Sequence, residues 1–330
     1  MDAVRLILCL FGCLTATLSW AKAPTWQPIE FQGAIIERED LSAVAVWNRG
    51  LIVASDERAA LQRLDPVDGR NRCYRAVQTI RLDREKVEVD VEGLATDRDT
   101  IYVLGSHSLI RPRIDRKKDL RSTRKEIVRR LLAVVSEPSR DQVFRIRLTP
   151  DGRGLRSFER ITLRSLIAGD PLLARFASIP GKENGIDLEG LAVADGKLIV
   201  GCRGPVLRAN FVPVLLIDFD RPRNYQMKLI RLDGRGIRSL ARVSNGFLLI
   251  GGPVGDGDAP FLLYHWDGGD QTPGQNVAQG RVVRLATVPS KPLGRPEGLA
   301  VLEETADSYR LLVVYDGVPR GGPIEWRVGK

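Results

Sequence analysis

The 330-residue sequence has only two histidines and lacks the short signatures of common catalytic sites. It has no Gly-x-Ser-x-Gly turn, no His-Glu-x-x-His helix, no pair of Cys-x-x-Cys motifs and no phosphate-binding P-loop. These absences exclude the familiar nucleophile, zinc and nucleotide signatures. They leave open metal-assisted chemistry on carboxylates.

Long hydrophobic runs are also absent, apart from one over residues 6–18. Arg5 precedes this run and Ala21, Lys22 and Ala23 follow it, which is the three-part pattern of a secretory signal. We therefore expect residues 1–23 to be a signal peptide and residues 24–330 to form one periplasmic or secreted domain. An uncleaved membrane anchor is the alternative, although the run is shorter than the ~20 residues that a span requires.

Cysteine is scarce, and after cleavage of the signal peptide only Cys73 and Cys202 of the four would remain. Export would permit one disulfide. The repeats described below place the two cysteines on opposite faces, whereas bridged Cα atoms lie within about 7 Å of each other. We therefore expect two unpaired thiols rather than a bridge.

Acidic residues number 41 against 50 basic ones, and most of the formal charge of +9 comes from one segment. From Arg111 to Arg130 ten Lys or Arg residues face three acidic residues, a balance of +7. The segment has no aromatic side chain for base stacking, which argues against a nucleic-acid groove. It is either a solvated face or a contact for a small anionic ligand or an envelope surface of lipopolysaccharide or phospholipid.

A six-residue unit is repeated along the chain. Its clearest copy is Asp-Leu-Glu-Gly-Leu-Ala at 187–192, with further copies at 90–95 and 295–300 and weaker ones at 40–45 and 236–241. The fourth position is always small and the sixth is always alanine. An apolar run begins six residues after that alanine in four copies and eleven residues after it in the last. The pattern predicts a repeated β-hairpin.

Further candidate strands complete four antiparallel strands per repeat, which is typical of a propeller blade. We predict an all-β fold, a β-propeller with five four-stranded blades. The 97 residues between the second and third copies of the unit leave six blades as the alternative. The last repeat lacks an outer strand, and residues 28–36 could supply it and close the ring.

Two helical insertions interrupt the repeats, at residues 109–141 and 164–186. Thr123 and Glu126 form a capping box before an apolar stripe at 127, 128, 131, 132 and 135, and a second short helix begins at Asp170-Pro171. Both insertions leave from the end where the inner strands begin. We call this end the mouth, and we expect each helix to cover a surface there.

The third position of the repeat forms a ring at the mouth, consisting of Ser42, Glu92, Glu189, Arg238 and Glu297. Three buried carboxylates without partners would cost several kcal/mol each, so something must compensate them. Arg238 and Arg295 compensate part of this charge. A calcium ion could compensate the rest. The alternative is a clasp in which each glutamate accepts hydrogen bonds from backbone N–H groups of the next blade.

Two further groups at the mouth are candidates for function. His107 ends a strand directly before the first insertion, where an imidazole could act as a general base or bind an anion, or be a structural residue. Arg203 and Arg208 flank a Gly-Pro turn, which suits two-point contact with an oxyanion, or belong to a solvated loop.

The stretches 187–192, 203–208, 106–107 and 296–300 resemble an uncharacterised family of exported bacterial proteins, a domain of unknown function, over nearly the whole mature chain. The Glu-Gly-Leu-Ala unit alone is similar to phytase-like and esterase-like propellers. The closer resemblance implies no activity, and the looser one implies calcium and phosphoester hydrolysis. Ser42 and Arg238 stand where a complete calcium cage would have carboxylates.

These observations favour a metal-assisted hydrolase of a small anionic ester or phosphoester at the mouth. The predicted catalytic residues are Glu92, Glu189, Glu297 and His107. The predicted substrate-binding residues are Arg203, Arg208, Arg238 and Arg295. The predicted Ca²⁺ ligands are Glu92, Glu189, Glu297, Asp90 and Asp187. The alternative is a non-catalytic propeller that binds a ligand or protein at the same mouth, and in either case we expect a monomer.

Overall fold

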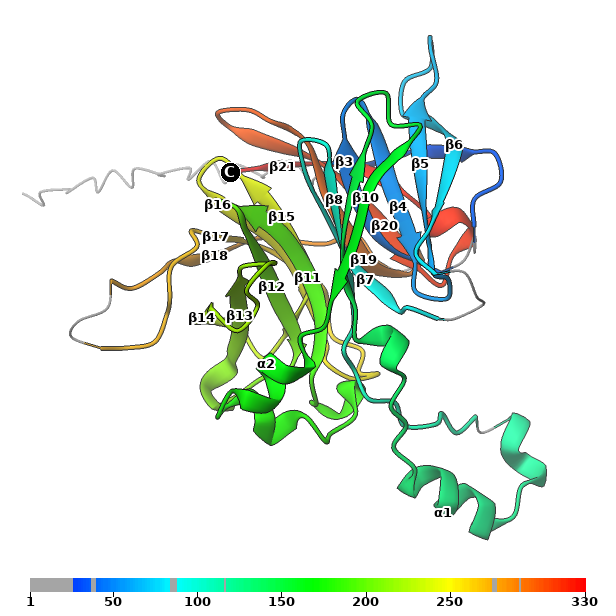
Figure 1. Ribbon diagram of the computed structural model, residues 1–330, viewed down its shortest axis with the longest axis vertical. Helices are drawn as coiled ribbons and strands as arrows, with labels where there is room; N and C mark the ends of the chain where they lie inside the picture. Colours follow the sequence, from blue (N-terminus) through cyan, green and yellow to red (C-terminus); the bar gives the residue numbers. More distant parts are fainter. Residues whose placement is uncertain (1–25, 37–39, 84–87, 116, 275–277, 291) are drawn as a thin grey trace, which may run out of the picture.

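The computed structural model describes residues 26–36, 40–83, 88–115, 117–274, 278–290 and 292–330. The expected signal peptide lies outside these residues. Five sheets are arranged around a central axis, and the fold is the predicted five-bladed β-propeller (Figure 1).

Each blade has four antiparallel strands. Blade 1 consists of β3 (Leu41–Trp47), β4 (Gly50–Ser55), β5 (Ala60–Pro66) and β6 (Cys73–Arg81). Blade 2 consists of β7 (Val91–Asp97), β8 (Thr100–Gly105), β9 (Val143–Leu148) and β10 (Leu155–Ile161). Blade 3 consists of β11 (Asp187–Ala194), β12 (Lys197–Gly204), β13 (Phe211–Ile217) and β14 (Tyr225–Arg231). Blade 4 consists of β15 (Gly236–Val243), β16 (Gly246–Gly252), β17 (Leu262–Trp266) and β18 (Val282–Thr287). Blade 5 consists of β19 (Arg295–Glu304), β20 (Ser308–Asp316), β21 (Ile324–Gly329) and β1 (Trp26–Pro28).

The inner strands close a complete circle. β3 contacts β7, β7 contacts β11, and so on through β15 and β19, which returns to β3. The alternative of six blades is wrong, because the long interval between the second and third repeats holds the rest of blade 2 and the two insertions.

The hairpin turns have the expected chemistry. Asp195 and Gly196, which join β11 to β12, have φ angles of 52° and 73°. Both angles lie in the left-handed region that two-residue hairpin turns require, and Asp-Gly adopts it readily. Buried apolar side chains then fill the space between neighbouring blades, where Val143 of blade 2 shares a cluster with Leu191 of blade 3.

The N-terminal segment closes the ring, although not with the strand that the sequence indicated. β1 pairs antiparallel with β21, with Trp26 opposite Trp326, and this supplies the missing outer strand of blade 5. Residues 30–32, which were expected to continue that strand, instead form β2 (Glu30–Gln32) and pair in parallel with β6 of blade 1. The burial of Ile29 and Phe31 explains the crossing, because these side chains fill the seam between the last blade and the first.

Both insertions lie at the mouth and contact each other. The first contains η1 (Lys118–Arg121), α1 (Arg124–Leu132) with the predicted capping box, and η2 (Pro138–Arg140). The second contains α2 (Arg164–Gly169), which the sequence did not indicate, then η3 (Leu173–Phe176) and η4 (Gly181–Glu183). The Asp170 carboxylate accepts from the backbone N–H groups of Leu172 and Leu173, so the helical turn predicted at this point is the short η3.

The two cysteines are unpaired, as predicted. Cys73 begins β6 in blade 1 and Cys202 lies on β12 in blade 3, and both are buried. Burial raises the pKa of the Cys202 thiol, so this side chain stays in its neutral form. None of the helices in the described part of the chain is long and apolar enough to cross a membrane.

Candidate functional site: a charged mouth built on five β-bulges

Every inner strand has a β-bulge at the third position of its repeat. On β7, for example, the register of paired residues skips Glu92 between Val91 and Gly93. The five skipped residues are Ser42, Glu92, Glu189, Arg238 and Glu297. A bulge re-aims the side chain of the extra residue. The ring predicted from the sequence therefore rests on one backbone device that all five blades share.

The residue after each bulge is small because neighbouring inner strands approach closely there. A Cβ atom added to Gly93 would lie 2.7 Å from the Cβ atom of Leu191 on the next blade. One added to Gly190 would lie 2.7 Å from the Cγ2 atom of Ile237. Both distances are shorter than real Cβ contacts allow, so a side chain at either position would push the blades apart.

A chain of buried ion pairs links blades 3, 4 and 5. Arg203 Nη1 lies 2.8 Å from Glu189 Oε1 and 3.5 Å from Asp187 Oδ2. Arg238 Nε lies 3.1 Å from Glu189 Oε2, and Arg238 Nη2 donates to Glu297 Oε1. All five side chains are less than a tenth exposed. We call this set, Asp187, Arg203, Glu189, Arg238 and Glu297, the arginine half of the mouth.

The link between Arg238 and Glu189 is an ion pair without hydrogen-bond alignment. Arg238 Nε and Glu189 Oε2 are close, yet neither atom has an aligned hydrogen-bond partner in the part of the chain that the structure describes. Their attraction is Coulombic, and at this burial it is much stronger than it would be in water. The predicted clasp is thus present between blades, but guanidinium groups take the place of the expected backbone N–H donors.

Burial raises the pKa values of two carboxyl groups of the arginine half to near neutral pH. Burial raises the pKa of Asp187 to about 7, and Arg203 opposes this shift only in part. Burial likewise raises the pKa of Glu297 to about 7, against the opposing charge of Arg238. At pH 7 each of these groups is therefore protonated in a substantial fraction of molecules.

The other side of the mouth carries carboxyl groups with few cations. Glu92 makes no hydrogen bond or ion pair with the described residues, and burial followed by the charges of Glu189 and Asp90 raises its pKa well above the usual range. Burial and the charges of Glu297 and Asp90 raise the pKa of Asp56, at the end of β4, to about 9. We call Asp56, Asp90 and Glu92, from blades 1 and 2, the carboxyl half.

Asp90 is the only member of the carboxyl half for which the described residues supply a guanidinium partner. Arg140 Nη1 donates to Asp90 Oδ2 at 2.6 Å, and Arg140 also pairs with Glu88 and Glu137. Arg140 ends η2 in the first insertion, so this contact fixes the insertion against the start of β7. The role of Arg140 could not be predicted from the sequence, because it depends on the chain folding back 50 residues after Asp90.

A pocket of about 430 Å³ opens beside the arginine half. It is lined by Arg203, Arg238, Arg295 and the loop from Pro253 to Phe261. Arg203 Nε donates to the backbone oxygen of Val254 at 2.7 Å, which connects this loop to the ion-pair chain. Arg203 Nη2 and Arg238 Nη1 donate to none of the residues that the structure describes. We call this the arginine pocket.

The predicted calcium ligands do not form a cage. Glu189 and Glu297 are engaged by Arg203 and Arg238, and Asp90 by Arg140. Among the described residues, no three His, Cys, Asp or Glu side chains are placed to hold a metal ion. Calcium needs six to eight oxygen ligands and is repelled by adjacent guanidinium groups. The donor set therefore does not fit calcium, and the calcium site stays a prediction without structural support.

His107 and Arg208 lie apart from the arginine pocket. His107 is fully buried, its Nδ1 bonds the Gly105 oxygen at 2.8 Å, and its Nε2 accepts from the backbone N–H of Leu163 at 3.1 Å. Burial lowers the pKa of His107 to about 4, so the ring is neutral and ties β8 to the second insertion. This geometry gives His107 a structural role. Arg208 is exposed on η5 (Arg208–Asn210) and lines no pocket described here.

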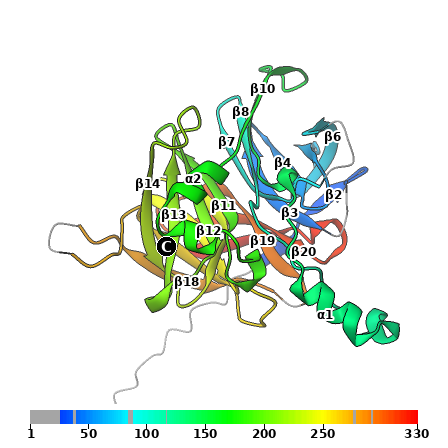
Figure 2. The same cartoon turned by 60° about the horizontal axis from the view of Figure 1, so that its bottom comes forward.

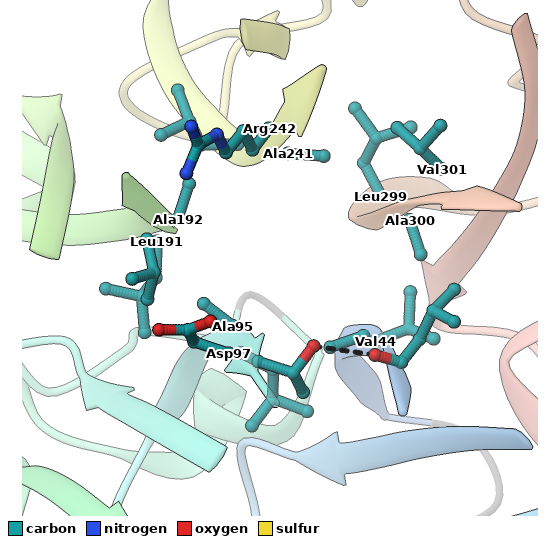
Figure 3. A pocket seen from close by; sticks show the side chains of 16 residues that line it. Val44, Ala95, Asp97, Leu191, Ala192, Ala241, Arg242, Leu299, Ala300 and Val301 are labelled. Atoms are coloured by element: carbon teal, nitrogen blue, oxygen red, sulfur yellow. Dashed lines mark hydrogen bonds between the residues drawn. The ribbon is translucent and has the colours of Figure 1, made fainter. Parts of the chain in front are cut away.

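The opposite end of the channel is apolar. Figure 3 shows side chains such as Leu191, Ala192, Leu299 and Ala300 around a cavity of about 270 Å³, with Asp97 among its few charged groups. These residues come from the fifth position of the repeat onward. Buried ion pairs thus lie at the mouth, whereas mainly aliphatic side chains, with Thr96, Asp97 and Arg242, line the other end.

Fold and mouth together define a five-bladed β-propeller with a charged opening and two helical insertions beside it. The chain belongs to the family described as protein of unknown function (DUF3616), whose model matches residues 40–321. A comparison with curated proteins gives no match.

Several solved structures are similar in fold. A glutaminyl cyclase from Myxococcus xanthus is 14% identical, with 92% of this chain and 94% of that chain covered and a TM-score of 0.48. A PQQ-bound aldose sugar dehydrogenase from Streptomyces coelicolor is 13% identical, with 93% and 98% covered and a TM-score of 0.42. A streptogramin B lyase is 8% identical, with 92% and 98% covered and a TM-score of 0.41. Likeness at this level says nothing about activity.

Proposed function

We propose that the protein binds a small molecule with a carboxylate or phosphate group in the arginine pocket. The observation that carries this proposal is the pair of buried guanidinium groups, Arg203 and Arg238, which line the pocket and keep N–H groups free of described partners. Carboxylates behind them fix both groups in place. Charge-assisted hydrogen bonds from such pre-organised donors are among the strongest that a protein makes to an oxyanion.

Size and charge at the pocket agree with this proposal. A pocket of about 430 Å³ is within the usual range for small-molecule sites. Arg295 is exposed at its rim and adds a third positive charge. Asp256 and Asp258 on the covering loop also line the pocket, so a ligand with both an anionic and a polar or cationic part would match the lining better than a simple anion.

The reaction that this mouth supports best is hydrolysis of an ester or phosphoester bond of the bound molecule, with Glu92 as the proton-transfer group. Glu92 lies outside the lining of the arginine pocket, on the bulge of the neighbouring blade, and an electrostatic interaction links it to Arg203. Water adds its oxygen to the acyl carbon or phosphorus, and the bond to the leaving alcohol oxygen breaks. That oxygen takes a proton from the Glu92 carboxyl, whose raised pKa favours the protonated form, and Glu92 recovers a proton from the attacking water. No metal takes part in these steps.

Binding is tested by calorimetric titration with inorganic phosphate and with acetate. We expect saturable binding, weakened about tenfold by Arg295→Gln, because one charged hydrogen bond contributes roughly 1.5–3 kcal/mol. Arg208→Gln is the matched control, since Arg208 is equally exposed but lies outside the arginine pocket. If neither probe binds, or if Arg295→Gln and Arg208→Gln behave alike, the arginine pocket is not the binding site.

Catalysis is tested with a panel of generic carboxylic esters and phosphoesters, with a chelator and with added calcium. We expect Glu92→Gln to lower the rate roughly 10²- to 10⁴-fold, the usual contribution of a positioned acid or base. The chelator should leave the rate unchanged. A rate that survives Glu92→Gln removes Glu92 from the reaction, and a rate that depends on calcium would revive the metal-assisted alternative.

The second candidate function is a non-catalytic propeller that binds its ligand in the same pocket. It is favoured by the ion pairs of Glu189 and Glu297 with Arg203 and Arg238, because a carboxylate held in this way is less available as a proton acceptor or nucleophile. Binding of phosphate or acetate without hydrolysis of any panel member would select this function.

A further inference from the structure

The first insertion forms an arm, residues 110–115 and 117–135, that projects from the disc (Figures 1 and 2). Its base is an antiparallel bridge in which the backbones of Ile110 and Val135 exchange two hydrogen bonds, of 2.9 and 2.8 Å. Arg111 fixes the end of α1 by donating to the backbone oxygen of Ala133 at 3.2 Å, and it pairs with Glu183 of the second insertion. The arm is therefore held in a defined direction.

Most of the apolar stripe of α1 is exposed, and Ile127 at its start is half-buried. No residue of α1 is buried, and the exposed fractions of Val128, Leu131 and Leu132 are 36%, 47% and 76%. Leu120, on η1 of the same arm, is 82% exposed. The expectation that this helix covers a surface of the propeller is wrong. Its apolar side finds no cover in the described part of the chain, and large apolar patches of this kind mark interaction surfaces.

The remaining faces of the arm are strongly basic. Arg111 and Arg130 are used within the protein, since Arg130 pairs with Asp119 at 2.6 Å and Arg111 with Glu183. Six basic side chains form no ion pair with the described residues: Arg113, Lys117, Arg121, Arg124, Lys125 and Arg129. Free positive charge and exposed leucine thus occur together on one short projecting element.

We propose that this arm docks the protein onto the surface of an anionic lipid bilayer. A short helix with an apolar stripe and a basic face is the combination that lies in the headgroup region, with leucines at the acyl boundary and lysines and arginines on the phosphates. A solvated face accounts for the charge but not for the leucines. An acidic nucleic acid accounts for the charge as well, but gives Leu131 and Leu132 no apolar phase to enter.

The position of the arm gives this docking a direction. The arm leaves the propeller at the mouth and contacts the second insertion there through Arg111 and Glu183. At nine residues, α1 is about 13 Å long, too short to span a bilayer, so the contact stays at the surface. A docked molecule would turn its mouth toward the lipid.

The experiment measures co-sedimentation of the whole protein with vesicles of phosphatidylcholine alone or with added phosphatidylglycerol. We expect binding only to the anionic vesicles, and weakening at high salt. Changing Arg124, Lys125 and Arg129 to Gln should lower the partition coefficient about a hundredfold, because each basic residue near such a surface contributes about 1 kcal/mol. Changing Leu131 and Leu132 to Gln should lower the partition coefficient relative to that of the native protein, most clearly at high salt, where charge attraction is screened and apolar insertion remains.

A matched control carries the same loss of charge elsewhere, with Arg160, Arg223 and Arg327 changed to Gln, all exposed and outside the arm. It should bind like the native protein. The proposal is overturned if the native protein ignores anionic vesicles or if control and arm variants bind equally. If the leucine variant binds vesicles normally and the native protein binds heparin as tightly as lipid, the arm recognises polyanions rather than a bilayer.

Discussion

The arginine half and the carboxyl half of the mouth are both built on β-bulges, but the buried carboxyl groups in the two halves have different electrostatic surroundings. In both, a β-bulge aims the third residue of the repeat at the axis. In the arginine half Glu189 has two guanidinium neighbours, whereas Glu92 in the carboxyl half has no such partner among the described residues. The bulge sets the direction of a side chain. The charged groups around that side chain then determine whether its carboxyl group forms ion pairs or has a raised pKa.

The largest expected effect comes from breaking the arginine half at its centre. Arg238→Ala leaves Glu189 and Glu297 buried without that cation and should lower the free energy of unfolding by roughly 3–5 kcal/mol. The change is measured by chemical denaturation. Arg242→Ala, an exposed change four residues along β15, is the control and should cost less than about 0.5 kcal/mol. A loss below about 1 kcal/mol for Arg238→Ala would mean that water or a ligand already compensates the two carboxylates.

Equivalent substitutions in the two halves should differ in cost. Glu189→Gln removes the charge that holds Arg203 and Arg238, and it should cost roughly 2–3 kcal/mol of unfolding free energy. Glu92→Gln replaces a carboxyl group whose charged form is disfavoured by burial and should change that free energy by less than about 1 kcal/mol. The free energies of unfolding of both variants are measured by denaturation at pH 7. Equal losses would show that the two halves do not differ in this respect.

A graded effect should appear in the pH dependence of stability. The pKa of Asp56 rises from 3.8 to about 9 on folding, so between these values the folded protein holds a proton that the unfolded chain releases. The free energy of unfolding therefore falls as pH rises through this interval. Asp56→Asn removes that loss. The variant should match the native protein near pH 4, and its advantage should then grow by up to about 1.4 kcal/mol for each pH unit toward pH 8.

Parallel pH profiles for the two proteins would show that Asp56 is ionised in the folded state. Glu297→Gln provides the contrast. Its carboxyl pKa is also raised, to about 7, but the same change removes a partner of Arg238 and should lower stability at pH 8.

The fold could be predicted from the sequence because its information is local and repeated. A bulge residue, a small residue and an aliphatic residue followed by alanine recur five times, and the small residue is required where inner strands approach, as at Gly93. The mouth could be predicted only in part. The repeat placed Glu92, Glu189 and Glu297 around one axis, but it could not show that Arg203 from a second strand would approach Glu189.

Other features of the site depend on where the chain folds back, and the sequence has no periodic pattern that predicts this. Arg140 reaches Asp90 only because the first insertion folds back on itself, and His107 accepts a hydrogen bond from Leu163, the residue directly before the second insertion. The helix α1 was predicted correctly by its capping box. That its apolar side would remain exposed depends on where the arm is directed, and helical periodicity carries no information about that.

The closing strand has a consequence for how the molecule must assemble. Trp26 pairs with Trp326, so β1 completes a sheet whose other strands lie far along the chain, at residues 295–329. Such a contact carries a large loop-closure cost and cannot form early. Four blades can form while blade 5 is still incomplete. The ring closes only when β1 pairs with β21.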